Sequence, residues 1–383
     1  MKKNDYVSKA GLKARGWTDS LINQFLPECD REARNPHYAC AAKMKLYSLS
    51  KVESIEASDS FTEALGLIQM RKERRAQSVI AKKRKMVDFI NSAELGIPEM
   101  GREELLVTAL TRYNYLYHDL LANYGCREIP HEYSPLTLDS DPVLLAGLAN
   151  RYLWSQVPDL TDALRQRFGE KLLDEGLSIF HSRATAIIDN LYPWIGQTVK
   201  DRKRFLFLDT ETTGLSPLYD DLVQVAWSLT DEKDMEITSG NFIIKPDGFT
   251  IPASATRIHG ITTNQAIADG APLKDVIRLL AYSYDSATNV VGHNIGFDID
   301  FISKAASEVG VVLRGKHRHY DTAEHGTTYC KLPSSSFRYR YRTPSLTELH
   351  QTLFGHPFDG AHDAMADAQA TRRCFWGLMN SFR

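Results

Sequence analysis

The chain has 383 residues, of which 43% are apolar and 25% charged, and its formal net charge of −2 neither indicates nor excludes a nucleic-acid partner. This length suggests two or three domains, and the composition is that of a globular protein rather than of a disordered or fibrous one. The sequence has no apolar run near the ~18 residues of a membrane span, no secretory signal and no Cys-x-x-Cys pair, so we expect a cytoplasmic protein without disulfides, structural zinc or membrane contact.

Residues 1–58 are predicted to form a small module. A first helix starts near Ser8, and Thr18 is the expected N-cap of a second helix whose apolar residues follow at helical spacing. A strand-like run, KMKLYSL, then leads into a third helix. This order loosely resembles the winged-helix modules of the MerR and XPA-like kind. A helical cap that only packs on its neighbours is the alternative.

Residues 59–200 are predicted to be helical, with a break between Pro130 and Pro142. Phe61 to Ser92 is predicted to be one long helix, and its middle, RKERRAQSVIAKKRK, holds eight basic residues and a single acid, Glu73. Such a run either follows a phosphate backbone or is a solvated face.

Four tyrosines occur in the next helical segment. Their spacing favours a helix core, with base stacking as the alternative, for Tyr113, Tyr115, Tyr117 and Tyr124. Residues 197–203 form a polar linker, which places the firmest expected boundary near residue 200.

Residues 201–383 show a mixed α/β pattern. Strands are predicted at 205–208, 222–229, 241–245, 289–293 and 318–321, and helices at 254–259, 273–282, 297–308, 345–354 and 363–379. Three successive strands followed by alternating helices and strands favour a mixed sheet flanked by helices, preceded by a mostly α-helical N-terminal region.

Two carboxylates follow the first of these strands, in the stretch FLFLDTETTGL at 205–215. Asp209 and Glu211 lie two positions apart, so in a strand they point to the same face. Paired carboxylates at the end of a buried strand repel one another unless a cation lies between them, and Mg²⁺ or Mn²⁺ prefers such oxygen ligands. A strand end with two solvated acids is the alternative.

Two further blocks, GHNIGFDIDF at 292–301 and AHDAMAD at 361–367, follow in the same order as the motifs of a known family. Together the three blocks resemble the exonuclease motifs of the DEDDh (DnaQ-like) 3′–5′ exonuclease family over about residues 204–378. The resemblance implies a ribonuclease H-like fold. Position 363 is Asp363, whereas the sister DEDDy group has a tyrosine there, so the chain sorts with the histidine group.

The resemblance also implies a catalytic constellation. Asp209 would bridge two divalent cations, Mg²⁺ or Mn²⁺, with Glu211 and Asp367 holding one of them and Asp298 the other. His362, on the loop before the last helix, would accept the proton of the attacking water, since imidazole has an unperturbed pKa of about 6.5. Two cations stabilise both the attacking and the leaving oxygen, and the expected product is a nucleoside 5′-monophosphate.

The substrate contacts implied by the same resemblance are Thr212, Thr213, Leu215 and His259, of which His259 is equally suited to a structural turn. Asn294 either contacts the nucleotide or caps a helix. In FRYRYR at 337–342, strand alternation places Arg338, Arg340 and Arg342 on one face, which suits a single-stranded nucleic acid. The alternative for FRYRYR is a sheet-edge strand protected by charges.

The sequence therefore predicts three domains, 1–58, 59–200 and 201–383, and a two-metal 3′–5′ exonuclease acting on DNA or RNA with a single-stranded 3′ end. A catalytically silent nucleic-acid-binding or scaffold protein with the same fold is the alternative, although every catalytic position is filled. A homodimer or a protein partner that docks on the N-terminal region is also left open.

Overall fold

The computed structural model describes residues 5–34, 43–124, 135–200, 202–315, 317–335 and 338–381. Its contacts divide the chain into two compact units, one of Met1–Ala93 with Leu160–Phe180 and the other of Glu94–Asp159 with His181–Arg383. The boundaries expected at residues 58 and 200 do not coincide with this division. The physical reason is that α4 (Asp59–Ser92) packs on α7 (Thr161–Phe168), whereas α5 (Arg102–Asn123) and α6 (Pro142–Gln156) pack on α12 (Leu273–Ser286), a helix that covers the C-terminal sheet.

The first unit begins with a small sheet and three helices. Strands β1 (Tyr6–Ser8), β3 (Met44–Ser48) and β2 (Arg31–Ala33) pair antiparallel in that order, next to helices α1 (Lys9–Ala14), α2 (Asp19–Phe25) and α3 (Leu49–Glu56). The side chain of Thr18 caps α2 as predicted. Strands β1 and β2 were not predicted, because three residues are too few for an alternating pattern to be recognised.

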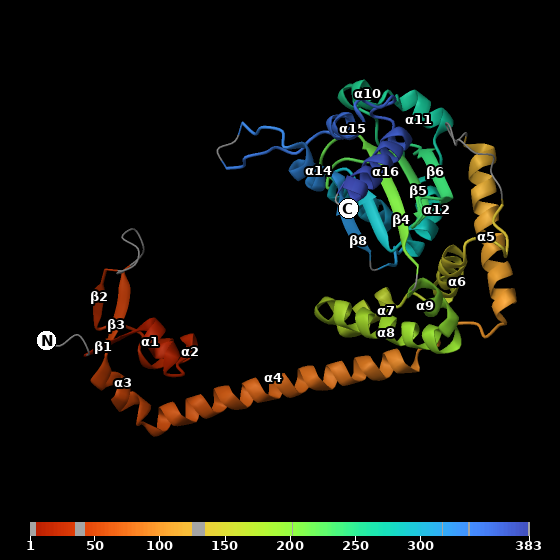
Figure 1. Ribbon diagram of the computed structural model, residues 1–383. Helices are drawn as coiled ribbons and strands as arrows, with labels where there is room; N and C mark the ends of the chain where they lie inside the picture. Colours follow the sequence, from red (N-terminus) through yellow and green to blue (C-terminus); the bar gives the residue numbers. More distant parts are fainter. Residues whose placement is uncertain are drawn as a thin grey trace. The chain divides into compact units, whose positions relative to one another are not determined.

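Helix α4 (Asp59–Ser92) is a single helix of 34 residues, close to the predicted bounds (Figure 1). At its start the ring of Phe61 lies 4.5 Å from that of Trp17, and near its end Phe89 lies 5.9 Å from Phe168. The segment 161–191, part of the predicted helical region, is divided at Gly169, whose φ of 79° ends the first helix. It consists of α7 (Thr161–Phe168), a 3₁₀ turn (Glu170–Leu172) and α8 (Leu173–Leu191).

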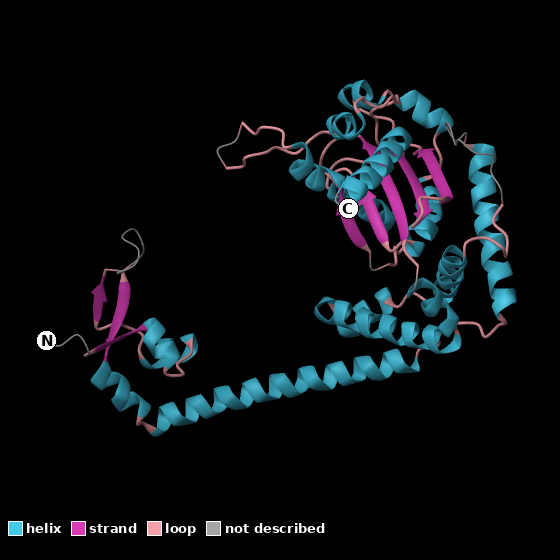
Figure 2. Cartoon of the chain, in the orientation of Figure 1, coloured by secondary structure: helices cyan, strands magenta, loops and turns pink. Residues whose placement is uncertain are grey.

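The second unit is built on a five-stranded sheet in the order β6-β5-β4-β7-β8 (Figure 2). The bounds are β4 (Arg204–Thr212), β5 (Leu222–Asp231), β6 (Glu236–Ile243), β7 (Asn289–Gly292) and β8 (Arg318–Asp321). Strands β4, β5 and β6 pair antiparallel, whereas β4 with β7 and β7 with β8 pair parallel. The predicted mixed sheet flanked by helices is confirmed.

Helices cover both faces of this sheet. Leu206 and Leu208 of β4 lie in the large core shared with α12 (Leu273–Ser286) and α13 (Ile295–Glu308), whereas Phe207 packs on Phe375 of α16 (Ala364–Ser381). The remaining helices are α10 (Ala253–His259), α11 (Thr263–Asp269), α14 (Thr322–Cys330) and α15 (Leu346–Phe354). Helices α11 and α14 were not predicted.

Helices α5 (Arg102–Asn123), α6 (Pro142–Gln156) and α9 (Pro193–Lys200) belong to the same core as the sheet. The hydroxyl of Tyr117 donates to the carbonyl of Ser239 on β6, and Tyr113 shares a hydrogen bond with Thr238 on the same strand. The core interpretation is therefore confirmed for Tyr113 and Tyr117, whereas Tyr115 is 76% exposed. Among the residues that the structure describes, no helix is both long and apolar enough to cross a bilayer.

Candidate active site

Two carboxylates project from the end of β4 toward helix α16. Asp209 and Glu211 share the face of Phe207, which packs on α16, because alternate residues of a strand point the same way. Opposite Asp209 on β5 lies Ala226, and its small side chain packs against Ala364 and Met365 at the start of α16. Because the side chain of Ala226 is small, the start of α16 can lie against the end of β4.

The third carboxylate, Asp367, lies in the first turn of α16, and His362 lies in the turn before that helix, as the spacing predicted. His362 has a φ of 70°, a left-handed conformation, and its backbone N–H donates to Asp367 Oδ2 at 3.0 Å. Glu211, His362 and Asp367 each offer one possible ligand atom, and these three atoms lie within 4.8 Å of one another.

The fourth carboxylate, Asp298, lies in the first turn of α13 and is only 3% exposed. The hydroxyl of Thr210 donates to Asp298 Oδ1 at 2.7 Å. Because Thr210 lies between Asp209 and Glu211 on β4, this hydrogen bond fixes Asp298 beside the strand that carries the first two acids.

Burial raises the pKa of all four acids, and the charges of the other site acids raise those of Asp209 and Glu211 further. The pKa of Asp209 is raised well above its usual value, first by burial and then by the charges of Asp298, Asp367, Glu211 and Asp363. Burial is also the largest cause that raises the pKa of Glu211 to about 8, that of Asp298 to about 7 and that of Asp367 to about 6. The site without cations thus holds carboxylates that cannot all ionise at neutral pH without cost.

This donor set fits divalent cations. Hard cations such as Mg²⁺ and Mn²⁺ take carboxylate oxygens, and bound cations reverse the repulsion that raises these pKa values. One carboxylate oxygen, Oδ1 of Asp367, is buried and has no hydrogen-bond partner among the described residues. This unpaired oxygen beside Glu211 can therefore coordinate a cation.

Gln224 is a site residue that sequence reasoning missed. It pairs with Glu211 across β4 and β5, and its amide donates to Asn241 Oδ1 at 2.8 Å and to Asp363 Oδ2 at 3.1 Å. Asp363 in turn accepts from the backbone N–H groups of Met365 and Ala366 and so caps α16. The signal in the sequence was a polar glutamine inside the otherwise apolar stretch LVQVAW, and the structure shows that this glutamine is buried.

The loop after β4 presents apolar side chains beside the acids. Leu215, Leu218 and Tyr219 are 88%, 74% and 81% exposed. The hydroxyls of Thr212 and Thr213 are used within the loop, where Thr212 donates to the carbonyl of Gly214 and Thr213 accepts from the N–H of Asp221. A Cβ at position 214 would lie 2.5 Å from the carboxylate of Asp220, so a larger residue there would displace that side chain, which accepts from the N–H of Ser216.

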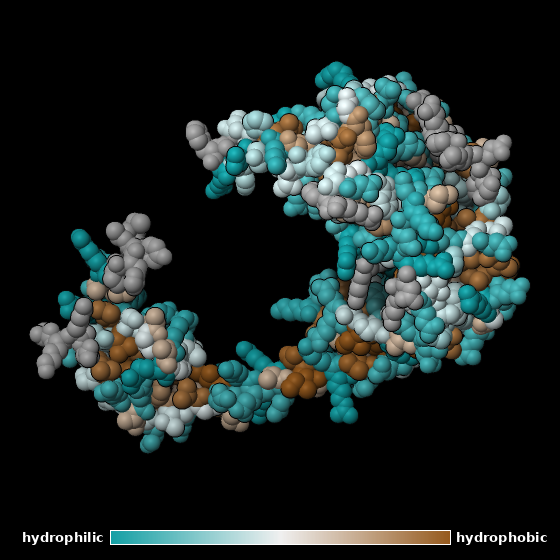
Figure 3. Space-filling model, viewed as in Figure 1, coloured by the Kyte–Doolittle hydropathy of each residue, from teal (hydrophilic) through white to brown (hydrophobic). Residues whose placement is uncertain are grey.

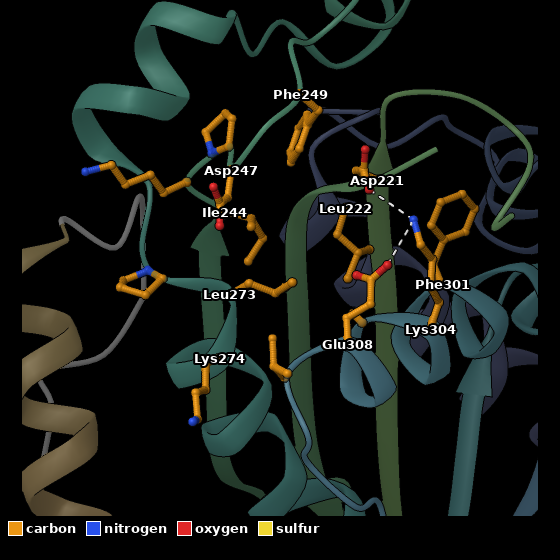
Figure 4. A pocket seen from close by; sticks show the side chains of 15 residues that line it. Asp221, Leu222, Ile244, Asp247, Phe249, Leu273, Lys274, Phe301, Lys304 and Glu308 are labelled. Atoms are coloured by element: carbon orange, nitrogen blue, oxygen red, sulfur yellow. Dashed lines mark hydrogen bonds and ion pairs between the residues drawn. The ribbon is translucent and has the colours of Figure 1, made fainter. Parts of the chain in front are cut away.

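Asp221, at the end of that loop, is tied to α13 by Lys304, whose ammonium also lies 3.5 Å from Glu308 (Figure 4). These residues border a cavity of about 530 Å³ whose apolar floor includes Leu222 and Phe301. None of the predicted site residues lines this cavity.

Two histidines near the motifs have structural contacts. His259 ends α10, and its Nδ1 accepts the N–H of Ile261 at 3.1 Å, while its buried Nε2 has no partner among the described residues. The pKa of His259 is lowered first by burial and then by the charge of His362, so the two rings are electrostatic neighbours. His293 contacts Thr322 and the carbonyl of Pro344.

Asn294 precedes α13 with a φ of 70° and makes no side-chain cap bond, so the predicted capping role is not observed. Its backbone N–H donates to Asp321 Oδ1 instead. Asn294 lines a cleft of about 1070 Å³ together with Tyr339 and Tyr341.

The predicted strand FRYRYR is part of a hairpin rather than an edge of the large sheet, and Phe337 lies outside the described residues. Ser334 and Arg342 donate backbone hydrogen bonds to Arg340 and Leu332 across the hairpin. The guanidinium of Arg342 forms two hydrogen bonds with Glu348 at the start of α15, and its substrate contact stays a prediction. Arg338 and Arg340 are exposed.

Residues 206–375 match the Exonuclease (RNase_T) family. The chain is 25% identical over 191 residues to a DNA polymerase III subunit epsilon-like protein of Rhodobacter capsulatus, covering 49% of this chain and 25% of that protein. It is 26% identical over 212 residues to a DNA polymerase III PolC-type protein of Listeria innocua, covering 54% of this chain and 13% of that protein. The chain therefore spans a quarter or less of the length of these relatives.

A solved structure, E. coli Exonuclease I in complex with a dT13 oligonucleotide, is similar over 47% of this chain and 41% of that one, with 23% identity and a TM-score of 0.40. The family match over residues 206–375 agrees with the order of the three motifs. The predicted resemblance to the DnaQ-like DEDDh exonucleases is therefore confirmed for that segment.

Proposed function

We propose that this chain is a 3′–5′ exonuclease that hydrolyses phosphodiester bonds from the 3′ end of a nucleic acid. The observation that carries the proposal is the convergence of Asp209, Glu211, Asp298 and Asp367, from three separate elements, beside His362. Acids that raise one another's pKa values destabilise the fold, so their gathering points to function.

Asp209, Glu211, Asp298 and Asp367 would hold two divalent cations, Mg²⁺ or Mn²⁺. Bound there, the cations would lower the pKa of a water molecule and offset the negative charge that develops on the phosphate. Glu211 and Asp367, which lie next to His362, are proposed to hold the cation nearer the attacking water.

His362 is proposed as the general base. Its imidazole is exposed, and the hydrogen bond from its own backbone N–H to Asp367 holds the turn that presents it. The imidazole takes the proton of the water, the water oxygen bonds to phosphorus, and the bond from phosphorus to the 3′ oxygen of the preceding nucleotide breaks. The products are a nucleoside 5′-monophosphate and a strand that is one nucleotide shorter.

The substrate proposed for this site is a single-stranded 3′ end of DNA or RNA. Exposed apolar side chains such as Leu215 suit contact with the terminal base, and Tyr339 and Tyr341 in the cleft with Asn294 suit the stacking of further bases. Exposed Arg338 and Arg340 on the same hairpin suit phosphate contacts. The names of the curated relatives concern DNA polymerases, which favours DNA.

The test is digestion of 5′-labelled, sequence-matched DNA and RNA, single- and double-stranded, with Mg²⁺ or Mn²⁺. We expect a ladder that shortens from the 3′ end by single nucleotides, stops at a 3′-terminal phosphorothioate and is absent with EDTA. The control is Asp209→Asn, which should leave every strand intact. Intact strands with the unchanged chain and either metal would favour the silent binding protein and contradict the proposal.

A further inference from the structure

Most of the basic residues of the long helix α4 lie at exposed positions. Every side chain from 71 to 78 is exposed, as are Lys82 and Lys85. Figure 3 shows mainly hydrophilic side chains, interrupted by a few apolar ones, along the part of α4 that faces the viewer. The ends of α4 pack through Phe61 and Met86, so it is the middle of the helix that stays uncovered.

The basic residues are not spread evenly around this helix. Successive residues of an α-helix are rotated by about 100°, which places five of the eight basic residues within an arc of about 100°. The five, which we call the basic stripe, are Arg71, Arg74, Arg75, Lys82 and Lys85. No acid between residues 71 and 85 lies in that arc, because Glu73 projects from the opposite side, where Gln69 donates to its carboxylate. At about 1.5 Å per residue the stripe is about 21 Å long.

A merely solvated helix face would not be built in this way. Exposed single helices are normally supported by acid–base pairs three or four residues apart, and like charges at those spacings are destabilising. Here Arg71 lies three and four residues before Arg74 and Arg75, and Lys82 lies three before Lys85. Among the described residues, the ion pair from this part of α4 joins Lys83, outside the stripe, to Glu175.

We propose that the basic stripe of α4 binds the phosphate backbone of the nucleic acid on which the exonuclease domain acts. This inference rests on the proposed function. A polyanion along the stripe would offset the repulsion between its like charges and would release condensed counterions, which is the main source of sequence-independent affinity. Contacts to phosphates carry no sequence information, so this contact is expected to be independent of sequence.

The predicted effect follows from counterion release. Each phosphate contact contributes a slope of about −0.7 for a single strand, or −0.9 for a duplex, to the plot of log K against log salt. Losing two contacts should reduce the slope by about 1.4 or 1.8. At 0.1 M salt this corresponds to affinity losses of about 25-fold for a single strand and about 60-fold for a duplex.

The experiment compares two double charge reversals in the full chain carrying Asp209→Asn, which prevents turnover. The stripe variant is Arg75→Glu with Lys82→Glu. The matched control is Lys72→Glu with Arg84→Glu, which changes the net charge equally on the same helix but outside the stripe. Binding of 30-nucleotide single strands and 30-base-pair duplexes is measured from 0.05 to 0.3 M salt, and far-UV circular dichroism checks that α4 remains helical.

We expect the stripe variant to lose affinity and salt slope as calculated, and the control to lose less than threefold. Equal losses in both variants, or none in the stripe variant, would overturn the proposal. A stripe variant that keeps its affinity for nucleic acid but sediments as a monomer where the unchanged chain is a dimer would also overturn the proposal. The stripe would then bind a second copy of the chain. Hydrolysis of a trinucleotide by the chain with Asp209 intact tests the proposed function separately, since a trinucleotide has only two internal phosphates and is too short to follow the stripe.

Discussion

Replacing Asp209 by asparagine should stabilise the metal-free protein while removing its activity. The change deletes a buried charge that faces three other acids and leaves a side chain of nearly the same shape. Asp209 is the acid whose pKa is raised by burial together with Asp298, Asp367 and Glu211, so its ionised form is the one that the fold tolerates least without cations. An uncompensated buried polar or charged group costs about 1–3 kcal/mol, and we expect a gain of about 2 kcal/mol.

The sign of the pH dependence is fixed by the direction of these shifts. A carboxyl group whose pKa is higher in the folded than in the unfolded protein contributes stability below its unfolded pKa and loses it as the pH rises through the folded one. For Asp367, Asp298 and Glu211 the folded values are about 6, 7 and 8. The metal-free wild-type protein should therefore lose stability between about pH 5 and pH 8.5, and Asp209→Asn should lose less.

The assay is thermal unfolding in EDTA or MnCl₂ at pH 5 and pH 8.5. At about 2–4 °C per kcal/mol, we expect Asp209→Asn to unfold about 4–8 °C above the wild type in EDTA at pH 8.5 and close to it at pH 5. MnCl₂ should raise the Tm of the wild type much more than that of the variant, since a bound ligand stabilises the state that binds it.

The matched control is Asp300→Asn, which removes an exposed carboxylate two residues after Asp298 on the same helix. It should change neither the pH dependence nor the response to MnCl₂. An Asp209→Asn variant that is no more stable than the wild type at pH 8.5 in EDTA would refute the reasoning that the acids repel one another in the metal-free site.

Three further predictions concern the site and its support. His362→Ala should lower the hydrolysis rate by about 100-fold or more and still gain Tm with MnCl₂, whereas an unchanged rate would exclude it as the base. Arg204→Met should lower the free energy of unfolding by about 3 kcal/mol and the Tm by about 6 °C or more, because the carboxylate of Asp141 loses its buried partner. Adding Asp141→Asn should recover part of this loss, and an unchanged Tm in Arg204→Met would contradict the prediction. Gln224→Ala should lower the hydrolysis rate by about tenfold or more and leave the circular dichroism spectrum unchanged, because Asp363 loses its hydrogen bond from the Gln224 amide at the start of α16. A wild-type hydrolysis rate would exclude this positioning role.

Much of the C-terminal fold could be predicted from the sequence, because its information is local. The apolar run at 205–208 shows in four residues that a strand is buried on both faces, and the structure places Phe207 and Leu208 in cores on opposite faces of the sheet. The placement of His362 before α16 likewise follows from its spacing of five from Asp367, which is incompatible with one helical face.

Contacts between residues that are far apart in the chain could not be predicted from the sequence. The helices before residue 200 join the core of the sheet through Tyr113 and Tyr117, whose partners lie more than 120 residues later.

The sequence by itself determined the identity of the acids and the order of the motifs, because both are properties of short stretches of chain. Only the tertiary structure decided that Gln224 supports the start of α16 and that the basic stripe of α4 is exposed. The physical reason is that hydrophobic periodicity records which face of an element is buried, whereas the partner that buries it, or its absence, is a property of the whole fold.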